Sequence, residues 1–271
     1  MWVSPTDPDA TLLSPLGGYT NKLGYHTHYV VDGGKARIIL ACLVTPASIH
    51  DDAPMLDLVR WARFRWQIRP RIAVGDGRYG TTPNIVGLEM DGVRAYLPRH
   101  AQHKRHKVYP REMFHYDAEE DCYICPQGHK LRHGSYNKAE RKWIYYTSST
   151  ICKACPVRPA CTTSKRGVRM IQRSVFQEFL DRAQAYRETE AYKKAMRKRK
   201  VWVEPLFGEA KQWHEARKFR LRRLEKVNIA ALMIASGQNV KRLISHKGWG
   251  KHQGPAGGSA ALAVVPSFSF S

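Results

Sequence analysis

The sequence predicts an α/β fold interrupted by a separate cysteine-containing module. Two runs rich in β-branched and aromatic residues, 24–32 and 36–45, flank a Gly-Gly turn and predict a hairpin of antiparallel strands. Apolar residues then recur at close to helical period over 51–67, and short apolar strands follow at 71–74 and 94–97. Strands that alternate with a helix in this way favour an α/β sheet over a helical bundle or a β-sandwich.

The composition points to a polyanionic partner. The chain has 271 residues and a formal net charge of +22, and so much cationic surface attracts nucleic acid above all. No apolar run reaches the roughly 18 residues that span a bilayer, and the N-terminus lacks the basic and apolar regions of a signal peptide. These features predict a cytoplasmic protein without a membrane partner.

Residues 99–173 differ in composition from the rest and predict a separate insertion. Two Cys-x-x-Cys pairs lie about 27 residues apart, a spacing typical of paired zinc knuckles. Five cysteines exceed the four ligand places, and His129 and His133 could compete. The preferred zinc ligands are Cys125, Cys152, Cys155 and Cys161. A site that has lost its metal is the alternative, whereas disulfides are disfavoured in the cytoplasm. Cys42 lies in a predicted strand and is expected in the core.

Asp76 follows the strand at 71–74 and lies between two glycines. The carboxyl ends of strands are where open α/β sheets place their chemistry, so this carboxylate is a candidate catalytic group. Because Asp-Gly is also a frequent turn dipeptide, a purely structural turn aspartate is the alternative.

Helices are predicted in the remainder, 174–250. Ser174 and Gln177 fit a capping box, and Pro205 predicts a kink or the start of a new helix next to Glu204. Glu204 and Lys211 are seven residues apart and therefore share one helix face. Another helix is predicted at 224–244, and the low-complexity tail at 251–271 is expected to be disordered.

A band of cations around these helices is the predicted DNA-binding surface, although any single member could be an ordinary solvated side chain. It consists of Arg197, Lys198, Arg199, Lys200, Lys211, Arg217, Lys218, Arg220, Arg222 and Arg223.

Taken in order, several motifs resemble the catalytic domain of bacterial DDE-type insertion-sequence transposases over roughly residues 6–243. The motifs are T-D-P-D-A, L-G-Y-H-T-H-Y-V-V-D, H-D-D-A-P-M-L, V-G-D-G-R-Y-G, C-P-Q-G-H, C-K-A-C-P-V-R-P-A-C and V-E-P-L-F-G-E-A-K. The resemblance implies a ribonuclease-H-like mixed sheet with flanking helices, interrupted between residues 99 and 173 by a small β-rich insertion, with catalytic parts at 1–98 and 174–250.

The resemblance also implies function. Such enzymes hold two Mg²⁺ ions with three carboxylates and catalyse phosphodiester cleavage and strand transfer on double-stranded DNA, at transposon ends and at the target. Asp76 matches the second acid, and Glu204 and Lys211 match the signature Tyr-x2-Arg-x3-Glu-x6-Lys. Arg197 and Lys200 replace its tyrosine and arginine, and lysine lacks the planar fork that suits phosphate. A homodimer is one option for the assembly.

The first acid of the family has no counterpart here. It normally lies in an Asp-Gly-Thr strand ahead of 24–32, and no Asp-Gly-Thr occurs in the sequence. Asp7, Asp9 and Asp32 are poor replacements, so the chain is expected to be an N-terminally truncated copy with impaired catalysis. Three functions stay open: an active transposase completed by an unrecognised acid or a second polypeptide, an inactive remnant that binds DNA, and an unrelated zinc-containing nucleic-acid-binding module.

Overall fold

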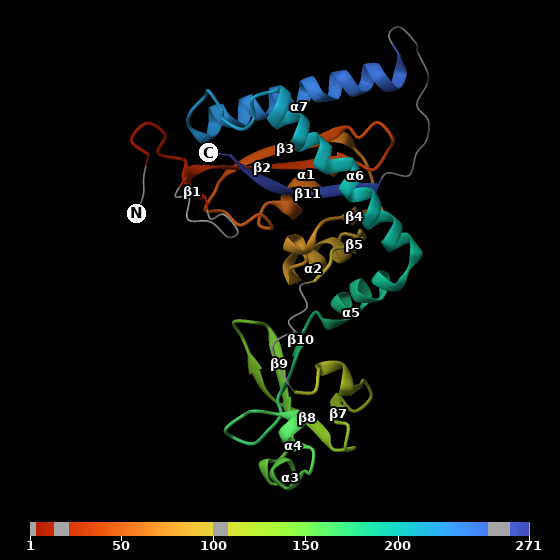
Figure 1. The fold of residues 1–271 in the computed structure, drawn as a ribbon. Coiled ribbons are helices and arrows are strands. Elements are labelled where there is room, and N and C mark those ends of the chain that lie inside the picture. Colours follow the sequence, from red (N-terminus) through yellow and green to blue (C-terminus); the bar gives the residue numbers. More distant parts are fainter. Residues whose placement is uncertain (1–3, 14–21, 100–107, 249–260, 271) are drawn as a thin grey trace. The chain divides into compact units, whose positions relative to one another are not determined.

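The computed structural model describes residues 4–13, 22–99, 108–248 and 261–270. The chain divides into two compact units (Figure 1): unit 1 is Met1–His100 with Phe179–Ser271, and unit 2 is Ala101–Glu178. The insertion expected at 99–173 corresponds to unit 2, which continues through Glu178. No helix in the described part of the chain is long and apolar enough to cross a membrane.

Unit 1 contains a six-stranded mixed sheet. The predicted hairpin is confirmed, because β2 and β3 pair antiparallel. The two short strands predicted at 71–74 and 94–97 are also confirmed as β4 and β5, which pair in parallel. In spatial order the main path is β1 (Thr11–Leu13), β2 (Lys22–Asp32), β11 (Ala261–Phe270), β4 (Ile72–Val74) and β5 (Arg94–Tyr96), and β3 (Ile39–Pro46) pairs with β2 beside this path. The α/β class predicted from the sequence is therefore confirmed.

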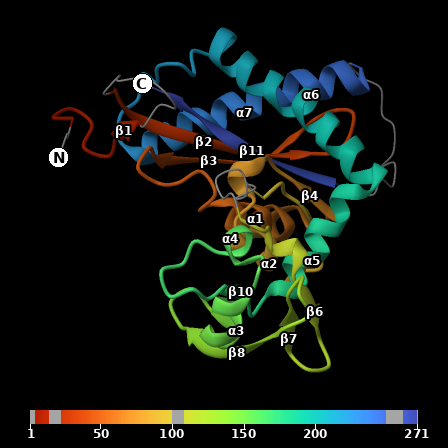
Figure 2. The ribbon, with the colours of Figure 1, turned by 60° about the horizontal axis from the view of Figure 1, so that its bottom comes forward.

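Helices cover both sides of this sheet. Figure 2 shows α6 and α7 on one side and α1 on the other. The helical elements of unit 1 are α1 (Met55–Trp66), η1 (Gly77–Tyr79), α2 (Thr82–Met90), η4 (Tyr186–Glu188), α6 (Glu190–Trp213) and α7 (Leu224–Lys247), and α5 (Gln177–Ala185) begins two residues before the unit boundary. The helix expected at 51–67 is α1, whose buried positions follow the helical period that predicted it.

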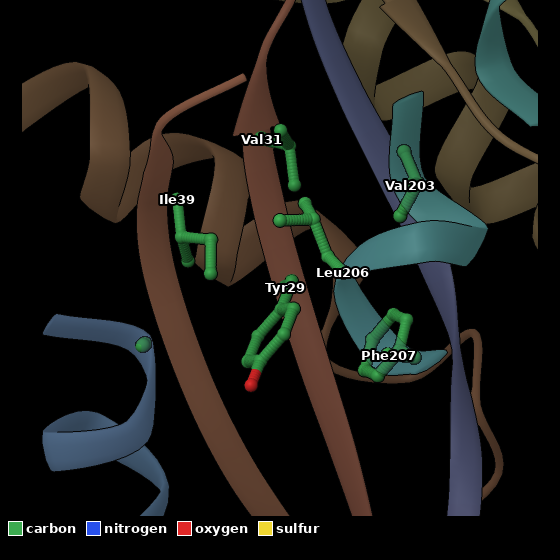
Figure 3. Packing of buried hydrophobic residues seen from close by; sticks show 7 residues of the cluster. Tyr29, Val31, Ile39, Val203, Leu206 and Phe207 are labelled. Atoms are coloured by element: carbon green, nitrogen blue, oxygen red, sulfur yellow. The ribbon is translucent and has the colours of Figure 1, made fainter. Parts of the chain in front are cut away.

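The main core of unit 1 joins the hairpin to α6 (Figure 3). Tyr29 of β2 stacks on Phe207 of α6 with ring centroids 4.5 Å apart, and both side chains are almost fully buried. Val31 and Ile39 pack in the same cluster with Val203 and Leu206. Each such side chain contributes about 1.5–3 kcal/mol by leaving water. The hydrophobic contact therefore fixes α6 against the hairpin.

Two asparagines of α7 hydrogen-bond the backbone of β3. The Asn228 side chain accepts from Val44 N at 2.7 Å and donates to Val44 O at 3.1 Å. Asn239, three turns further along, makes the same pair of bonds to Ile39 N and O, each 2.8 Å long. Unpaired backbone groups on a strand favour unwanted strand pairing. Here α7 satisfies them with side-chain amides.

Part of the expected disordered tail is ordered instead. Residues 261–270 form β11, which runs antiparallel to β2 and parallel to β4. The prediction rested on the Gly- and Ala-rich stretch before it, but 261–270 reads A-L-A-V-V-P-S-F-S-F, an apolar run suited to a central strand. The prediction is therefore wrong for 261–270, and the rest of 251–271 lies outside the described residues.

Pro205 neither ends α6 nor begins a new helix. The helix is continuous over Glu190–Trp213, so the predicted start of a new helix is wrong. A proline inside a helix leaves the carbonyl four residues earlier without its usual donor. That carbonyl is Val201 O, and the Arg37 guanidinium donates to it at 3.3 Å. Packing of α6 on the hairpin, which also brings Arg37 into reach, offsets the local cost of the proline.

Unit 2 contains a five-stranded antiparallel sheet in the order β10-β9-β8-β7-β6. Its core is built from Tyr123, Leu131 and Tyr145, each at most 2% exposed. The elements are η3 (Arg111–Met113), β6 (His115–Asp117), β7 (Cys122–Ile124), β8 (Lys130–Asn137), β9 (Lys142–Tyr146), α3 (Ser149–Ala154), α4 (Arg158–Cys161) and β10 (Ile171–Ser174). The insertion is thus β-rich, as expected.

His28 makes the stability of unit 1 depend on pH. It is 1% exposed on β2, and burial lowers its pKa to about 4. Between its ordinary pKa of 6.5 and about 4, the unfolded chain binds a proton that the folded chain does not. The contribution of His28 is therefore present above pH 6.5 and is lost as the pH falls towards 4. This difference corresponds to up to about 3 kcal/mol.

We expect His28→Gln, which can still reach Thr45 Oγ1, to flatten this dependence. The measurement is the free energy of unfolding in urea at several pH values between 7 and 4.5. Equal slopes for the wild type and the variant would assign the pH dependence to other groups.

Candidate active site and nucleic-acid interface

Asp76 caps the turn that follows β4. Its Oδ1 accepts from Arg78 N at 2.9 Å, and its backbone is extended before η1 begins. A Cβ at the preceding position, Gly75, would lie 2.7 Å from Leu97 Cδ2, so a larger residue there would have to displace the Leu97 side chain. The partly exposed carboxylate has the turn role that its Asp-Gly context suggests. It also lies at the strand end where the sequence placed it.

A second carboxylate is connected to this turn through Arg78. Its guanidinium donates to Asp51, which is 8% exposed, while its backbone N–H donates to Asp76. His26 Nδ1 lies 3.8 Å from the same Asp51 carboxylate. Burial raises the pKa of Tyr79 well above its usual value, and the charges of Asp51 and Asp76 add to the effect. Asp51 was not among the candidate residues predicted from the sequence, although it belongs to the motif H-D-D-A-P-M-L.

Glu204 lies on the exposed side of α6, with 53% of its side chain accessible. Arg199, one and a half turns earlier, approaches its Oε1 to 4.0 Å. Arg199 is itself only 8% exposed, and its Nε has no hydrogen-bond partner among the described residues. Because its side chain is buried, Arg199 is not part of the exposed cationic band that was predicted to bind phosphate.

Lys211 lies two turns beyond Glu204 on the same face, since α6 runs through both residues. Burial lowers its pKa, and the nearby charge of Arg217 lowers it further. Because α6 is continuous, Glu204 and Lys211 share one helix face, as expected from their spacing.

The acids do not form one cluster within the described part of the chain. No hydrogen bond or ion pair connects Asp76 with Glu204 there, and no three His, Cys, Asp or Glu side chains of the described residues form a group that could hold a metal ion. Because the family's reaction requires three carboxylates around Mg²⁺, the residues present do not fit a complete metal centre.

The other acids considered for the missing position have structural roles. Asp7 accepts from Tyr25 Oη at 2.6 Å and from Arg223 N at 2.9 Å. Asp9 accepts from Leu224 N at 2.9 Å and so caps the start of α7. Asp32 accepts from Gly34 N in the hairpin turn, as expected of a turn residue.

Most of the predicted cationic band is exposed. Lys198 lies over the Trp202 ring with its Nζ 4.7 Å from the centroid, which leaves its charge at the surface. Arg220 is held by Glu215 through two bonds of 2.9 and 3.0 Å. The exposed members are Arg197, Lys198, Lys200, Arg217, Lys218, Arg220, Arg222 and Arg223. They surround α6 and the segment between α6 and α7.

The four cysteines chosen as zinc ligands line one small apolar cavity of about 30 Å³ in unit 2, beside His129. Burial raises the pKa of Cys161, and Cys152, Cys125 and Cys155 raise it further because their charges lie nearby. All four thiols are free, and the fifth cysteine of the insertion, Cys122, is buried in β7. His133 pairs with Asp121 instead. Cys42 packs in the core of unit 1, as expected.

Comparison with known proteins adds one match. A family described as transposase DDE domain matches residues 124–244, a segment that contains Glu204, Lys211 and the four cavity cysteines but not Asp76. No curated protein and no solved structure matches the chain significantly. The match agrees with the resemblance read from the motifs and connects the chain to DNA transposition. Over residues 124–244, the chain is therefore similar to the DDE domain of transposases.

Proposed function

We propose that the chain acts in DNA transposition by binding double-stranded DNA through α6 and the segment after it. Eight exposed cations occupy this region, and the formal charge of +22 favours a polyanion. DNA binding is also what the transposase family implies. The mixed sheet, antiparallel at the hairpin and parallel at β4 and β5, supports the ribonuclease-H-like fold that we propose for unit 1.

The band would bind the phosphate backbone. Phosphate contacts give affinity and position the protein, whereas contacts with base edges specify sequence. Lys200 stands where the family has an arginine, and an ammonium group binds phosphate as a point charge without a bidentate fork. Arg220 keeps its guanidinium oriented by Glu215. We therefore propose DNA binding that depends on charge and discriminates little between sequences.

Phosphodiester cleavage needs more than the described residues provide. Asp76 and Glu204 are the carboxylates that the family would use for Mg²⁺, but they form no ligand group with a third acid in the described chain. We propose that the chain by itself cleaves DNA poorly in Mg²⁺. The competing proposal is an active transposase whose third carboxylate comes from an unrecognised acid or another polypeptide.

A salt titration tests DNA binding. Each phosphate contact releases counterions, so we expect affinity to fall steeply with salt. Reversing two band charges, Arg197→Glu with Lys200→Glu, should reduce the slope of log K against log salt by about 2. The matched control reverses Arg65 and Arg69, two exposed cations in and just after α1, on the other side of the sheet. An equal loss in both double variants would contradict a specific role of the band.

A nicking assay tests catalysis. With supercoiled DNA and Mg²⁺, we expect no nicking above background, and Asp76→Ala and Glu204→Ala should behave like the wild type. Mg²⁺-dependent nicking that both substitutions abolish would establish the active enzyme instead. Nicking that persists unchanged in both variants would indicate a contaminating nuclease.

We also propose zinc for the cysteine cavity of unit 2, because Cys125, Cys152, Cys155 and Cys161 all line it. Four thiolates are the donor set of structural zinc sites, although their positions in the structure do not form a ligand group. When bound, zinc would connect β7, α3 and α4. Purified protein should contain about one zinc ion per chain, and Cys152→Ser with Cys155→Ser should remove it. Zinc-free wild-type protein would contradict this assignment.

A further inference from the structure

An open groove of about 750 Å³ lies on unit 2, and its lining shares Thr147 with that of the cysteine cavity. It runs over the face of β8 and β9 opposite the unit's core. Side chains alternate along a strand, so Arg132, Ile144 and Tyr146 point into the groove while their neighbours Leu131 and Tyr145 point into the core. The sequence analysis and the proposed function assign nothing to this surface.

The groove is cationic and contains no carboxylate. Its lining includes Arg132, Arg166 and Lys130 but no Asp or Glu. Lys130 is engaged by Glu120 at 2.6 Å, outside the lining. Arg132 and Arg166 are exposed, and neither guanidinium group has a hydrogen bond or ion pair with a described residue. These two guanidinium groups are thus available for an anionic ligand. The remaining polar lining consists of hydroxyl groups, which donate well to phosphate oxygens.

An aromatic side chain, Tyr146, lines the groove and is partly exposed to solvent. Tyr146 is 39% exposed, and its ring lies directly on the backbone of Gly134. A Cβ at Gly134 would lie 2.3 Å from Tyr146 Oη and 2.4 Å from Cε1. The β8–β9 register shifts at this glycine, between His133 and Ser135. The missing side chain therefore creates the place for the ring.

We infer that this groove binds a single strand of DNA, with phosphates at Arg132 and Arg166 and a base stacked on Tyr146. Free guanidinium groups next to an exposed aromatic ring are the parts from which sequence-tolerant single-strand sites are built. An apolar floor of Ile144 and Met170 suits a base better than the hydrated side chains of an acidic peptide. The inference rests on the proposed role in DNA transposition and adds a second DNA contact on a different unit.

Fluorescence anisotropy of the full chain with a labelled oligonucleotide, single-stranded or duplex, tests the inference. The variant Arg132→Glu with Arg166→Glu should weaken single-strand binding about tenfold or more and lower its salt slope by about 1.4. The matched control, Lys138→Glu with Arg141→Glu, makes the same charge change at the exposed β8–β9 turn outside the groove. Equal weakening by the two double variants would overturn the inference.

The tyrosine is tested separately from the charges. Tyr146→Ala should weaken single-strand binding about tenfold and duplex binding much less, and Tyr146→Phe should retain single-strand affinity. Gly134→Ala keeps the tyrosine but displaces its ring, so it should resemble Tyr146→Ala. An unchanged midpoint of thermal unfolding shows that each variant is folded. Wild-type affinity in both Tyr146→Ala and Gly134→Ala would contradict the stacking role.

The outcomes distinguish this inference from the proposed function. If the wild type binds no DNA, the proposed function fails. If it binds and only the band variants of α6 weaken binding, the groove inference fails alone. Displacement of the strand by polyglutamate as efficiently as by unlabelled DNA of equal charge would overturn the nucleic-acid assignment of the groove.

Discussion

Val264→Pro is expected to destabilise unit 1 by about 3 kcal/mol or more, because it places a proline inside a central strand. Val264 pairs with Val30 in the ladder between β2 and β11, and β4 lies along the other edge of β11. In the spatial order of the strands, β11 is the connection between β2 and β4. A break there exposes two further strand edges, so the loss should exceed that of one hydrogen bond.

The check is urea unfolding followed by circular dichroism. Ser267→Pro provides the control, since residue 267 falls in the irregular stretch between Val265 and Phe268 where the register shifts. The control should retain most of the wild-type stability. Removal of residues 261–271 should abolish the cooperative transition of unit 1. A truncated chain that unfolds with the wild-type midpoint would show that β11 is dispensable.

Glu209→Ala is expected to cost about 3 kcal/mol, because it leaves a largely buried arginine, Arg242, without its counter-charge. Glu209 is 12% exposed and accepts from Arg242 at 2.6 Å and from Lys241 at 2.9 Å, which joins α6 to α7. Burial alone would raise the Glu209 pKa, but the hydrogen bonds from Lys241 and Arg242 hold it below its usual 4.5. The contribution of the pair is thus present above about pH 4.5 and is lost at lower pH.

Glu204→Ala is the matched control on the same helix. Glu204 is half exposed, and its ion pair with Arg199 is long, at 4.0 Å. Its removal should therefore change stability by less than about 0.5 kcal/mol. Chemical denaturation at pH 7 measures both variants. Equal effects of the two substitutions would contradict the distinct roles that their burial gives them.

The sequence predicted the elements whose signals are local. The β2–β3 hairpin follows from two β-rich runs around Gly-Gly, and α1 follows from its helical period. Local rules failed where tertiary contacts outweighed them. Pro205 stays inside α6 because packing on the hairpin holds the helix and Arg37 supplies a donor to Val201. β11 was missed because an isolated apolar run after a Gly-rich stretch does not reveal its partners.

The candidate site divides in the same way. Asp76 could be found because it follows a strand and lies between glycines, and Glu204 because it matches a spaced signature. Asp51 was missed, since its burial and its bond to Arg78 depend on segments that are distant in sequence. Arg199 was assigned to the wrong surface because a run of four cations does not reveal which one faces the core.

By itself, the sequence determined the α/β class, the cationic character and the similarity to transposases, because strand and helix periods, net charge and motif spacing are properties of short segments or of the whole composition. Only the tertiary structure decided which of two glutamates is largely buried, which strand fills the centre of the sheet, and that Arg132, Arg166 and Tyr146 share one groove. The physical reason is that burial and electrostatic environment arise from contacts between segments far apart in the chain, which no local pattern encodes.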